Sequence, residues 1–569
     1  MTPQSLSKFA LAACVVSAGC ATGGAISNTG ASAGPRTRAE RTNYLETSHY
    51  SDVMAFLDSL HGRPELVFGS IGKTNEGRDI PYVIASRPRV STPEEARALN
   101  RPIVYVQANI HAGEVEGKEA LLATLRDLTS SSGPNALDSI ILIAVPDYNA
   151  DGNERFASQE VNRGEQNGPE MVGVRANAQG LDLNRDYVKA EAPETRASLA
   201  MFDKWDPEVF VDLHTTDGSF HGYALTYAPP LNPAAPLGMF ARDSLMPVLR
   251  QRMQSRHGFA TFDYGDFFSD DTLSKGWYTF DSRPRFGTNY YGLRGRIAIL
   301  SEAFSHDPFE RRVASTYAFV HEILSLAAEK HAQLMQTRFP SRDSASLKLL
   351  PKPDGGTRGE RSAGLVIAKL QIPPGRLYPL RTEMIAAPDS QGVIAELMER
   401  TSDSTRTQAG VPKGRRRSGR FITVRMPVYD RFKATLWTDM PVMYLIPASD
   451  TAVIRLLRLH GINVAPGPVN FGKARVRLQQ FTIDSVIASP RAFQGHKETR
   501  LTGQWRDYAG ALSGSYYVVD VAMLPNGPMS VYLLEPQSED GFVDWNYFDS
   551  ELRPMGAFPI MRVLPPLDN

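Results

Sequence analysis

Two histidines and a glutamate in this chain have residue types and spacing that suit a metal ion. His111 and Glu114 stand three residues apart, so one helical turn or a bend places both side chains on the same side. His214 lies far along the chain, directly after an apolar run. Two imidazoles and one carboxylate make the ligand set of a catalytic zinc site, whose fourth position is left for water. The pair of His111 and Glu114 alone would also fit a surface salt bridge, so the case depends on its context.

Apolar runs precede the candidate residues and predict the strands that position them. The run 102–106 precedes His111, the run 209–213 precedes His214, and the run 296–301 precedes Glu302. In open α/β sheets, sites form at the carboxyl ends of the strands. We therefore expect the three side chains to meet just past those ends.

Other periodic segments predict an α/β fold for this part of the chain. Residues 64–87 have the pattern of a hairpin around a turn-rich centre, and residues 140–145 form an apolar run that suits a buried central strand. Apolar residues recur at helical spacing over 117–128 and 313–334. Strands that alternate with helices predict a mixed central sheet with helices on both faces.

The chain changes character after residue 340. Residues 349–361 are rich in proline, glycine and charge, which is typical of a linker. One helix is expected between an N-cap at Asp450 and a stop at Gly461. Short strand-like runs dominate elsewhere, at 421–424, 442–446 and 516–519. We therefore predict a β-rich α+β domain in the C-terminal part.

The polar segment 402–420 includes the run Arg415-Arg416-Arg417. Such a run could bind an anion, but no aromatic or helical pattern organises it. We predict a solvated loop for this segment.

The composition narrows the classes of function. The 569 residues are too many for one compact core, so at least two domains are expected. Lys plus Arg equals Asp plus Glu at 62 each, which gives no electrostatic argument for a nucleic-acid partner. The cysteines, Cys14 and Cys20, both lie in the first twenty residues, so the folded body has no thiol for disulfides, metal sites or nucleophilic catalysis.

The N-terminus has the pattern of a secretion signal. Lys8 precedes an apolar run over 9–19 that is too short to span a bilayer. Residues 16–20 resemble a bacterial lipoprotein cleavage box, which implies lipidation of Cys20; an ordinary signal peptide is the alternative. We expect a protein of the bacterial cell envelope or periplasm, attached to the membrane only through Cys20.

Segments of the first half, taken together, resemble the zinc carboxypeptidase family, which includes carboxypeptidases A and B. The matching segments, in the family's order, are 76–80, 111–114, 149–152, 181–185, 212–214 and 299–302. Ala150 departs from the family's Asn-Pro-Asp-Gly turn. The ordered set over residues 64–305 is far more specific than any one motif.

The resemblance implies a role for each matched residue. His111, Glu114 and His214 would bind one zinc ion, and Glu302 would act as general base on the zinc-bound water. An arginine suits recognition of a peptide's terminal carboxylate because its planar fork pairs both oxygens. In the segment 181–185, the resemblance implies that Asp182 orients His111. It implies that Asn184 and Arg185 bind the terminal carboxylate.

Two further roles in the family match this sequence less closely. Arg175 is our choice for the arginine that polarises the scissile carbonyl, with Arg163 as the competitor because its distance from Asn184 is nearer the usual one. Tyr278 is our choice for the tyrosine over the substrate, but Tyr290 and Tyr291 are close to it in sequence. Any of these tyrosines could instead pack in the core.

We interpret the chain as a zinc metallocarboxypeptidase that removes C-terminal residues from peptides. The alternatives are an amidohydrolase acting on N-acyl amino acids or peptidoglycan peptides, and a non-catalytic binding lipoprotein. Side-chain preference, exopeptidase against endopeptidase action, the role of the C-terminal domain and the oligomeric state stay open. Four arginines could favour acidic groups or be paired structurally: Arg283, Arg285, Arg294 and Arg296. The predicted parts are a lipoprotein-type signal peptide (1–20), a flexible tether (21–45), a catalytic domain (46–340), a linker (341–361) and a β-rich accessory domain (362–569).

Overall fold

The structure is a computed structural model, and part of the chain is described by it. The described residues are 34–130, 133–268, 273–336, 377–402, 411, 414–467, 476–521 and 526–565. Cys20, the predicted signal and most of the tether, and the predicted linker 341–361 lie outside them. No helix in the described ranges is both long enough and apolar enough to cross a membrane.

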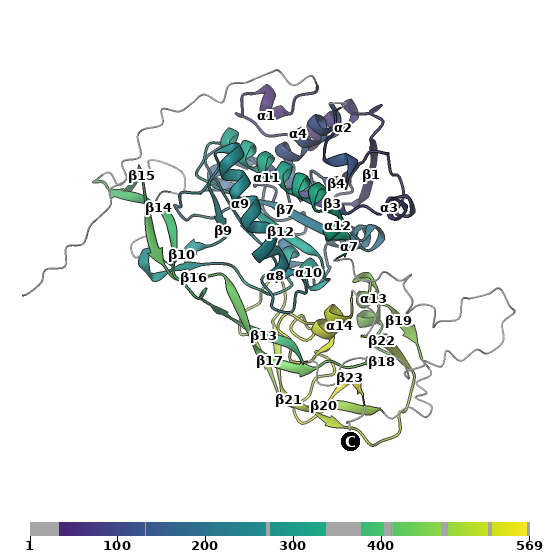
Figure 1. Ribbon diagram of the computed structural model, residues 1–569. Coiled ribbons are helices and arrows are strands. Elements are labelled where there is room, and N and C mark those ends of the chain that lie inside the picture. The colour runs from purple at the N-terminus through teal and green to yellow at the C-terminus, as the bar shows by residue number, and fades with distance from the viewer. Residues whose placement is uncertain are drawn as a thin grey trace, which may run out of the picture. The chain divides into compact units, whose positions relative to one another are not determined.

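An eight-stranded mixed sheet forms the centre of the first half (Figure 1). Its middle strands β4, β3, β7 and β12 run parallel, while β2 and β8 join them antiparallel on either side. The order across the sheet is β1 (Leu66–Lys73), β2 (Asp79–Ala85), β4 (Ile141–Val145), β3 (Ile103–Ala108), β7 (Val209–Thr215), β12 (Ile297–Ala303), β8 (Leu225–Ala228) and β9 (Thr261–Asp263). The predicted hairpin and central strands are confirmed.

Both faces of this sheet are buried, which is why its central strands have continuous apolar runs. Successive side chains of a strand point to opposite faces, so Val104 joins one core and Tyr105 the other. The first core includes residues of α2 (Tyr50–Ser59), α4 (Glu116–Ser130), α9 (Met246–His257) and α11 (Phe309–Glu329). The second includes α7 (Pro193–Trp205) and α10 (Gly287–Leu293). The predicted fold class is therefore confirmed.

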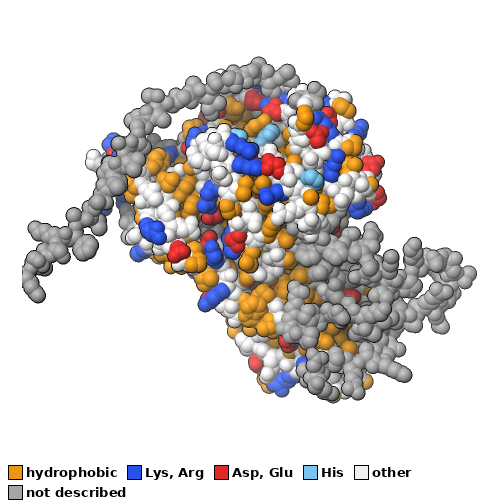
Figure 2. Space-filling model, viewed as in Figure 1, with side chains coloured by type: hydrophobic (Ala, Val, Ile, Leu, Met, Phe, Trp, Pro, Cys, Tyr) orange, Lys and Arg blue, Asp and Glu red, His pale blue; other side chains and the backbone are white. Residues whose placement is uncertain are grey.

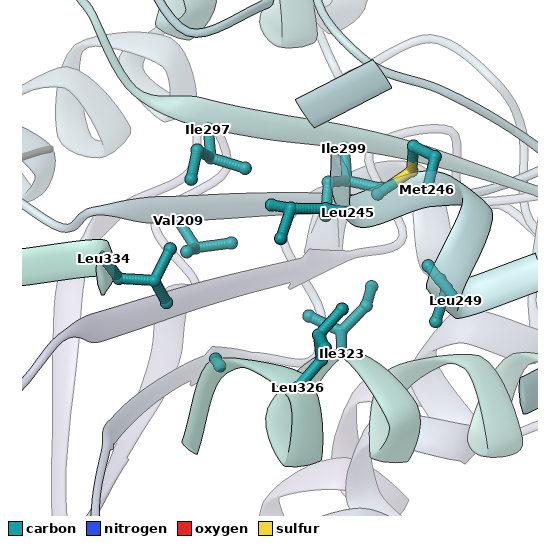
Figure 3. A pocket seen from close by; sticks show the side chains of 10 residues that line it. Val209, Leu245, Met246, Leu249, Ile297, Ile299, Ile323, Leu326 and Leu334 are labelled. Carbon is teal, nitrogen blue, oxygen red and sulfur yellow. The ribbon is translucent and has the colours of Figure 1, made fainter. Parts of the chain in front are cut away.

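The long helix predicted over 313–334 is two helices. α11 begins earlier, at Phe309, because its first turn also buries Phe309 and Arg312. It ends at Glu329, where Lys330 leaves the helical region with ψ 15°, and α12 (His331–Gln336) follows. The break lets Leu334 reach an apolar cavity beside α9 and β7 (Figure 3).

The C-terminal half is β-rich, as predicted. Its main sheet is antiparallel throughout and is accompanied by α13 (Thr451–Leu459), whose N-cap is Asp450, and α14 (Gly527–Leu534). The order across the sheet is β19 (Val464–Pro466), β22 (Tyr516–Asp520), β18 (Met443–Pro447), β23 (Ala557–Leu564), β20 (Arg477–Ala488) and β21 (Thr499–Asp507). Two-stranded sheets join β13 (Leu377–Ile385) to β17 (Arg431–Asp439), and β14 (Gln391–Arg400) to β15 (Arg415–Met426).

The prediction of a solvated loop over 402–420 is wrong for its second part. Residues Arg415–Met426 form β15, which pairs antiparallel with β14. Arg416 binds Glu399 and Arg417 binds Glu396, each at 2.7 Å. Glu399 is the register partner of Arg416, whereas Arg417 faces Met398 and reaches Glu396 past an irregularity in the register, so the partner strand supplies the charges that pair with the basic run.

Hydrophobic packing joins the two halves. One buried core cluster contains Tyr290 of α10 together with Tyr444 of β18 and Leu457 of α13. A buried hydrogen bond of 2.6 Å also links the Tyr290 hydroxyl to His460 Nδ1, directly after α13. The β-rich half therefore shares a core with the central sheet.

Candidate active site

The carboxyl ends of three neighbouring parallel strands bring the predicted residues together. His111 lies just beyond β3, whereas His214 and Glu302 are within the last residues of β7 and β12. His214 and Glu302 are register partners across the β7–β12 pair, so their side chains leave the sheet on the same face. The predicted meeting of the three side chains is confirmed, although two of them are within their strands rather than past the ends.

Sequence segments that resemble the family and lie far apart along the chain also contact one another. Asp151 of the 149–152 turn accepts hydrogen bonds from Thr74 Oγ1 at 2.7 Å and from the Glu76 backbone N–H at 2.8 Å, both in the connection between β1 and β2. Asn149 Nδ2 donates to the carbonyls of Ile110 and Arg175, each at 3.2 Å. This turn therefore fixes the backbone that leads into His111.

Glu114 lies between the two imidazoles. Its Oε1 is 2.9 Å from His111 Nδ1, and its Oε2 is 2.9 Å from His214 Nδ1. All three side chains are buried, and one ligand atom from each lies within 4.8 Å of the others. In the part of the chain that the structure describes, they are the one group of three or more such residues close enough to hold a metal ion.

A carboxylate lies behind each imidazole. His111 Nε2 donates to Asp182 Oδ1 at 3.0 Å, and His214 Nε2 lies 3.1 Å from Asp212 Oδ2. A hydrogen-bonded carboxylate fixes the ring orientation and tautomer of a metal-binding histidine, as Asp182 can for His111. His214 Nε2 and Asp212 Oδ2 are close but do not form a hydrogen bond in the described residues. Burial opposes ionisation of Asp182, but His111 and Arg175 hold its pKa well below the usual range.

Asp212 was not predicted from the sequence. It precedes His214 by two residues on β7, and this spacing places both side chains on one face of a strand. The alternation in Asp212-Leu213-His214 is a signal that could have identified it.

Glu302 faces the same space with an unsatisfied oxygen. The side chain is 8% exposed, and within the described residues its buried Oε2 has no hydrogen-bond partner. Burial raises the pKa of the Glu302 carboxyl well above its usual range. A buried carboxyl oxygen without a partner is costly, so it is a candidate for contact with water or a ligand.

A cavity joins these groups to the predicted carboxylate-binding residues. Its wall combines charged groups with an aromatic side, unlike the cavity of Figure 3, whose lining is entirely apolar and offers no chemistry. The lining residues are His111, Glu114, Arg175, Asn184, Arg185, His214, Thr215, Asp217, Tyr264, Phe280, Phe286, Thr288, Leu300 and Glu302.

Arg185 has no acidic partner within 4 Å among the described side chains, although the cavity is crowded with charge. Its guanidinium donates to the Asn184 carbonyl at 2.8 Å and lies 4.1 Å from the centre of the Phe286 ring. Burial lowers its pKa, and the nearby Asp182 carboxylate offsets this only in part. Asn184 is itself held by the Gly287 N–H, which donates to its Oδ1 at 2.9 Å. The structure thus leaves a positive group in the wall of the cavity.

Arg175 and Arg163 both contact Glu114 but occupy different places. Arg175 lines the cavity; its Nε donates to Asp182 Oδ2 at 3.0 Å, and its Nη1 is 3.4 Å from Glu114 Oε1. Arg163 is buried 3.1 Å from Glu114 and also donates to the carbonyls of Thr215 and Thr216. Of the two arginines, Arg175 is therefore the one placed to meet a ligand in this cavity.

The position of Arg163 also explains the glycine in His-Ala-Gly-Glu. A Cβ at Gly113 would stand 2.6 Å from Arg163 Cγ and 3.0 Å from the Gly173 carbonyl oxygen. A larger residue there would displace the arginine that supports Glu114.

The structure does not bring Tyr278 to the cavity. Its ring stacks on Tyr429 at 4.3 Å, and its hydroxyl donates to the Lys275 carbonyl. Tyr290 and Tyr291 are fully buried in the core. Tyr264 lines the cavity instead, and nothing in its surrounding sequence distinguishes it from a packing residue.

The arginine cluster near the predicted pocket is paired structurally. Arg285 binds Asp540 and Glu498, and each of the other three pairs with an aspartate. Those pairs are Arg283 with Asp281, Arg294 with Asp203, and Arg296 with Asp206. The four arginines are not among the residues that line the cavity, so they are not available there to attract an acidic group.

The sequence of residues 53–258 matches the family model described as zinc carboxypeptidase. This part of the chain therefore belongs to the zinc carboxypeptidase family. The ligand cluster, Arg175 and Arg185 lie within this match, while Glu302 lies beyond it and is placed by the pairing of β12 with β7.

Named relatives agree with this family. The chain is 27% identical over 282 residues to carboxypeptidase 2 of Trichophyton equinum, and 28% identical over 282 residues to a probable carboxypeptidase 2 of Arthroderma benhamiae. Each alignment covers 47% of this chain and 49% or 50% of the relative. The chain thus spans about half the length of these curated relatives.

Solved structures of similar proteins include a metallo-carboxypeptidase from Burkholderia cenocepacia and one from Pseudomonas aeruginosa. The first is 17% identical with a TM-score of 0.37, covering 50% of this chain and 70% of that one. The second is 18% identical with a TM-score of 0.37, covering 51% and 70%.

A zinc carboxypeptidase domain implies a zinc ion, and the residues present fit one. Nδ1 of His111 and of His214 both face the Glu114 carboxylate, so two nitrogens and an oxygen converge. This donor set suits zinc, and each imidazole has the carboxylate behind it that such sites use.

Proposed function

We propose that this protein is a zinc-dependent metallocarboxypeptidase that removes residues from the free C-termini of peptides. The observation that carries the proposal is Arg185, a guanidinium without an acidic partner within 4 Å among the described residues, in one cavity with Glu302 and the buried ligand cluster. A peptide's terminal carboxylate supplies the charge that this guanidinium lacks, and planar pairing fixes its orientation.

The arrangement of the cavity supports a task for each side chain. Asn184 and Arg185 would hold the terminal carboxylate, which presents the last peptide bond to Glu302. Arg175, whose guanidinium reaches the cavity beside Glu114, would donate hydrogen bonds to the carbonyl oxygen as negative charge develops on it. Glu302 would accept a proton from the attacking water and then pass it to the leaving amine.

One zinc ion per chain is part of this proposal. His111, Glu114 and His214 would hold it, while Asp182 and Asp212 would keep the two imidazoles in their binding orientation. The ion supplies a Lewis acid, which polarises oxygen ligands and favours their deprotonation near neutral pH.

The aromatic side of the cavity supports a preference for neutral, apolar C-terminal residues. Tyr264, Phe280 and Phe286 form a chain of edge-to-face ring contacts, with ring centres 5.7 Å and 5.1 Å apart. Thr288 and Leu300 complete the uncharged wall. A charged substrate side chain packed on these rings would lose its hydration without gaining an ion pair from them.

Cleavage-site profiling of the purified, zinc-loaded protein tests the proposal. A mixed peptide library with free C-termini should lose single, mainly apolar, terminal residues, and the same peptides with amidated C-termini should stay intact. Equal cleavage of both libraries, or cleavage at internal bonds, would contradict the assignment of Arg185. Hydrolysis of N-acyl amino acids without peptide cleavage would favour the amidohydrolase alternative.

We also propose that the protein acts in the bacterial cell envelope, attached through a lipidated Cys20. The support for this location is the sequence pattern of residues 8–20.

On the face drawn in Figure 2, basic and acidic side chains are interspersed, and this mixture offers no electrostatic argument for a nucleic-acid partner.

A further inference from the structure

A loop of the β-rich half reaches the segment that carries Arg185. Residues 489–498 connect β20 to β21, and the Ser489 N–H donates to the Glu498 carbonyl at 2.8 Å where the loop begins and ends. At its tip, Phe493 and His496 form a pair of backbone hydrogen bonds around Gln494 and Gly495. Gln494 has a φ of 49°, a left-handed conformation that a residue with a Cβ adopts only at a cost.

Contacts on several sides hold this tip in place. His496 lies 2.9 Å from Glu191 of the first half, and its other ring nitrogen lies 3.1 Å from Asn546 Oδ1. The Arg285 guanidinium lies close to the rings of Phe493 and Trp545, at 4.9 Å and 4.7 Å from their centres. The loop therefore has a fixed position relative to the cavity wall.

Gln494 makes a direct contact with the first half of the chain. Its Oε1 accepts a hydrogen bond of 3.0 Å from the backbone N–H of Asp182, across 312 positions of sequence. Asp182 opens the short helix Leu183–Arg185, caps it through the Asn184 N–H at 2.9 Å, and accepts from His111 Nε2. One residue thus links the His111 ring to the backbone that carries Arg185.

We infer that Gln494 is a positioning residue, through which the β-rich half holds the carboxylate-binding segment Asp182–Arg185 in its working place. A three-residue helix has little stability of its own, so its position depends on such outside contacts. This inference rests on the proposed function. It makes the C-terminal half a part of the active site rather than a separate accessory unit.

The test compares the zinc-loaded wild type with Gln494→Met, which keeps side-chain length but removes the acceptor. We expect KM for a peptide with a free C-terminus to rise about 5- to 10-fold, as for one lost hydrogen bond, with kcat changed less than KM. The Kd for free phenylalanine, measured by calorimetry, should rise by a similar factor. Gln494→Glu keeps an acceptor at the same reach and should restore most of the affinity, and Lys497→Ala on the same loop should behave as wild type.

The outcomes separate the inference from the proposed function. A zinc-loaded wild type without peptidase activity would contradict both the proposed function and the inference about Gln494. If Gln494→Met has the KM and Kd of the wild type, the inference about Gln494 is wrong and the proposed function is unaffected. A large fall in Tm together with equal losses in Gln494→Met and Gln494→Glu would also overturn it, because the residue would then act only on folding.

Discussion

The zinc-loaded Glu302→Gln variant is expected to hydrolyse peptides about 10²- to 10⁴-fold more slowly than the wild type, which is the range for loss of a general base. The amide has nearly the same shape as the carboxyl but cannot take up the proton. Because Glu302 and His214 are register partners on adjacent strands, the substitution should leave the ligand cluster in place. The variant should therefore keep its zinc while kcat falls.

The measurement combines steady-state kinetics with elemental analysis of the same protein sample. Glu310→Gln, an exposed carboxyl-to-amide change in the first turn of α11, is the matched control and should retain wild-type turnover. Wild-type kcat in Glu302→Gln would exclude Glu302 from proton transfer. Loss of zinc in that variant would instead show that Glu302 helps to hold the metal.

The Arg185→Met variant is expected to lose about 10²- to 10³-fold in kcat/KM on peptides with free C-termini, as when one partner of a buried charge pair is removed. Methionine keeps the packing on Phe286 while removing the charge. The zinc content should not change, since the Arg185 guanidinium donates to the Asn184 carbonyl and to neither imidazole among the described residues.

Kinetics on a matched pair of peptides, one free and one amidated at the C-terminus, separate recognition from general damage. The free peptide should lose its advantage over the amidated one in Arg185→Met. Arg97→Met, which removes an exposed arginine on the same domain, should keep the wild-type ratio. An unchanged ratio in Arg185→Met would place carboxylate recognition elsewhere.

The convergence of His111, His214 and Glu302 could be predicted because it depends on local pattern. Continuous apolar runs identify buried parallel strands, and parallel strands end at a common edge. The same logic extends to Asp212, whose alternation with His214 was visible in the sequence. Residues whose position is set by the strand that carries them can therefore be predicted from the sequence.

Residues whose role depends on tertiary contacts were not predictable in the same way. Tyr264 lines the cavity and Tyr278 does not, yet both are aromatic residues in irregular sequence. Arg163 and Arg175 both contact Glu114 Oε1, and the choice between them required knowing which one lines the cavity.

Distant pairing explains the remaining differences. Arg416 and Arg417 lie in a strand that pairs with β14, where they bind Glu399 and Glu396, and neither partner is apparent from the basic run itself. Gln494 and Asp182 are 312 positions apart, and no local periodicity connects them. Such contacts are fixed by how the two halves pack, which local patterns do not encode.

The assignment of the metal site can be tested by measuring the zinc content of the purified protein beside that of His111→Ala. We expect about one zinc per wild-type chain, because one imidazole–carboxylate–imidazole cluster is present in the described residues. We expect a substoichiometric content in a folded His111→Ala variant, which lacks one of the three ligands. Full zinc occupancy in that variant, or a wild-type protein that binds none, would contradict the assignment of His111, Glu114 and His214 as the metal site.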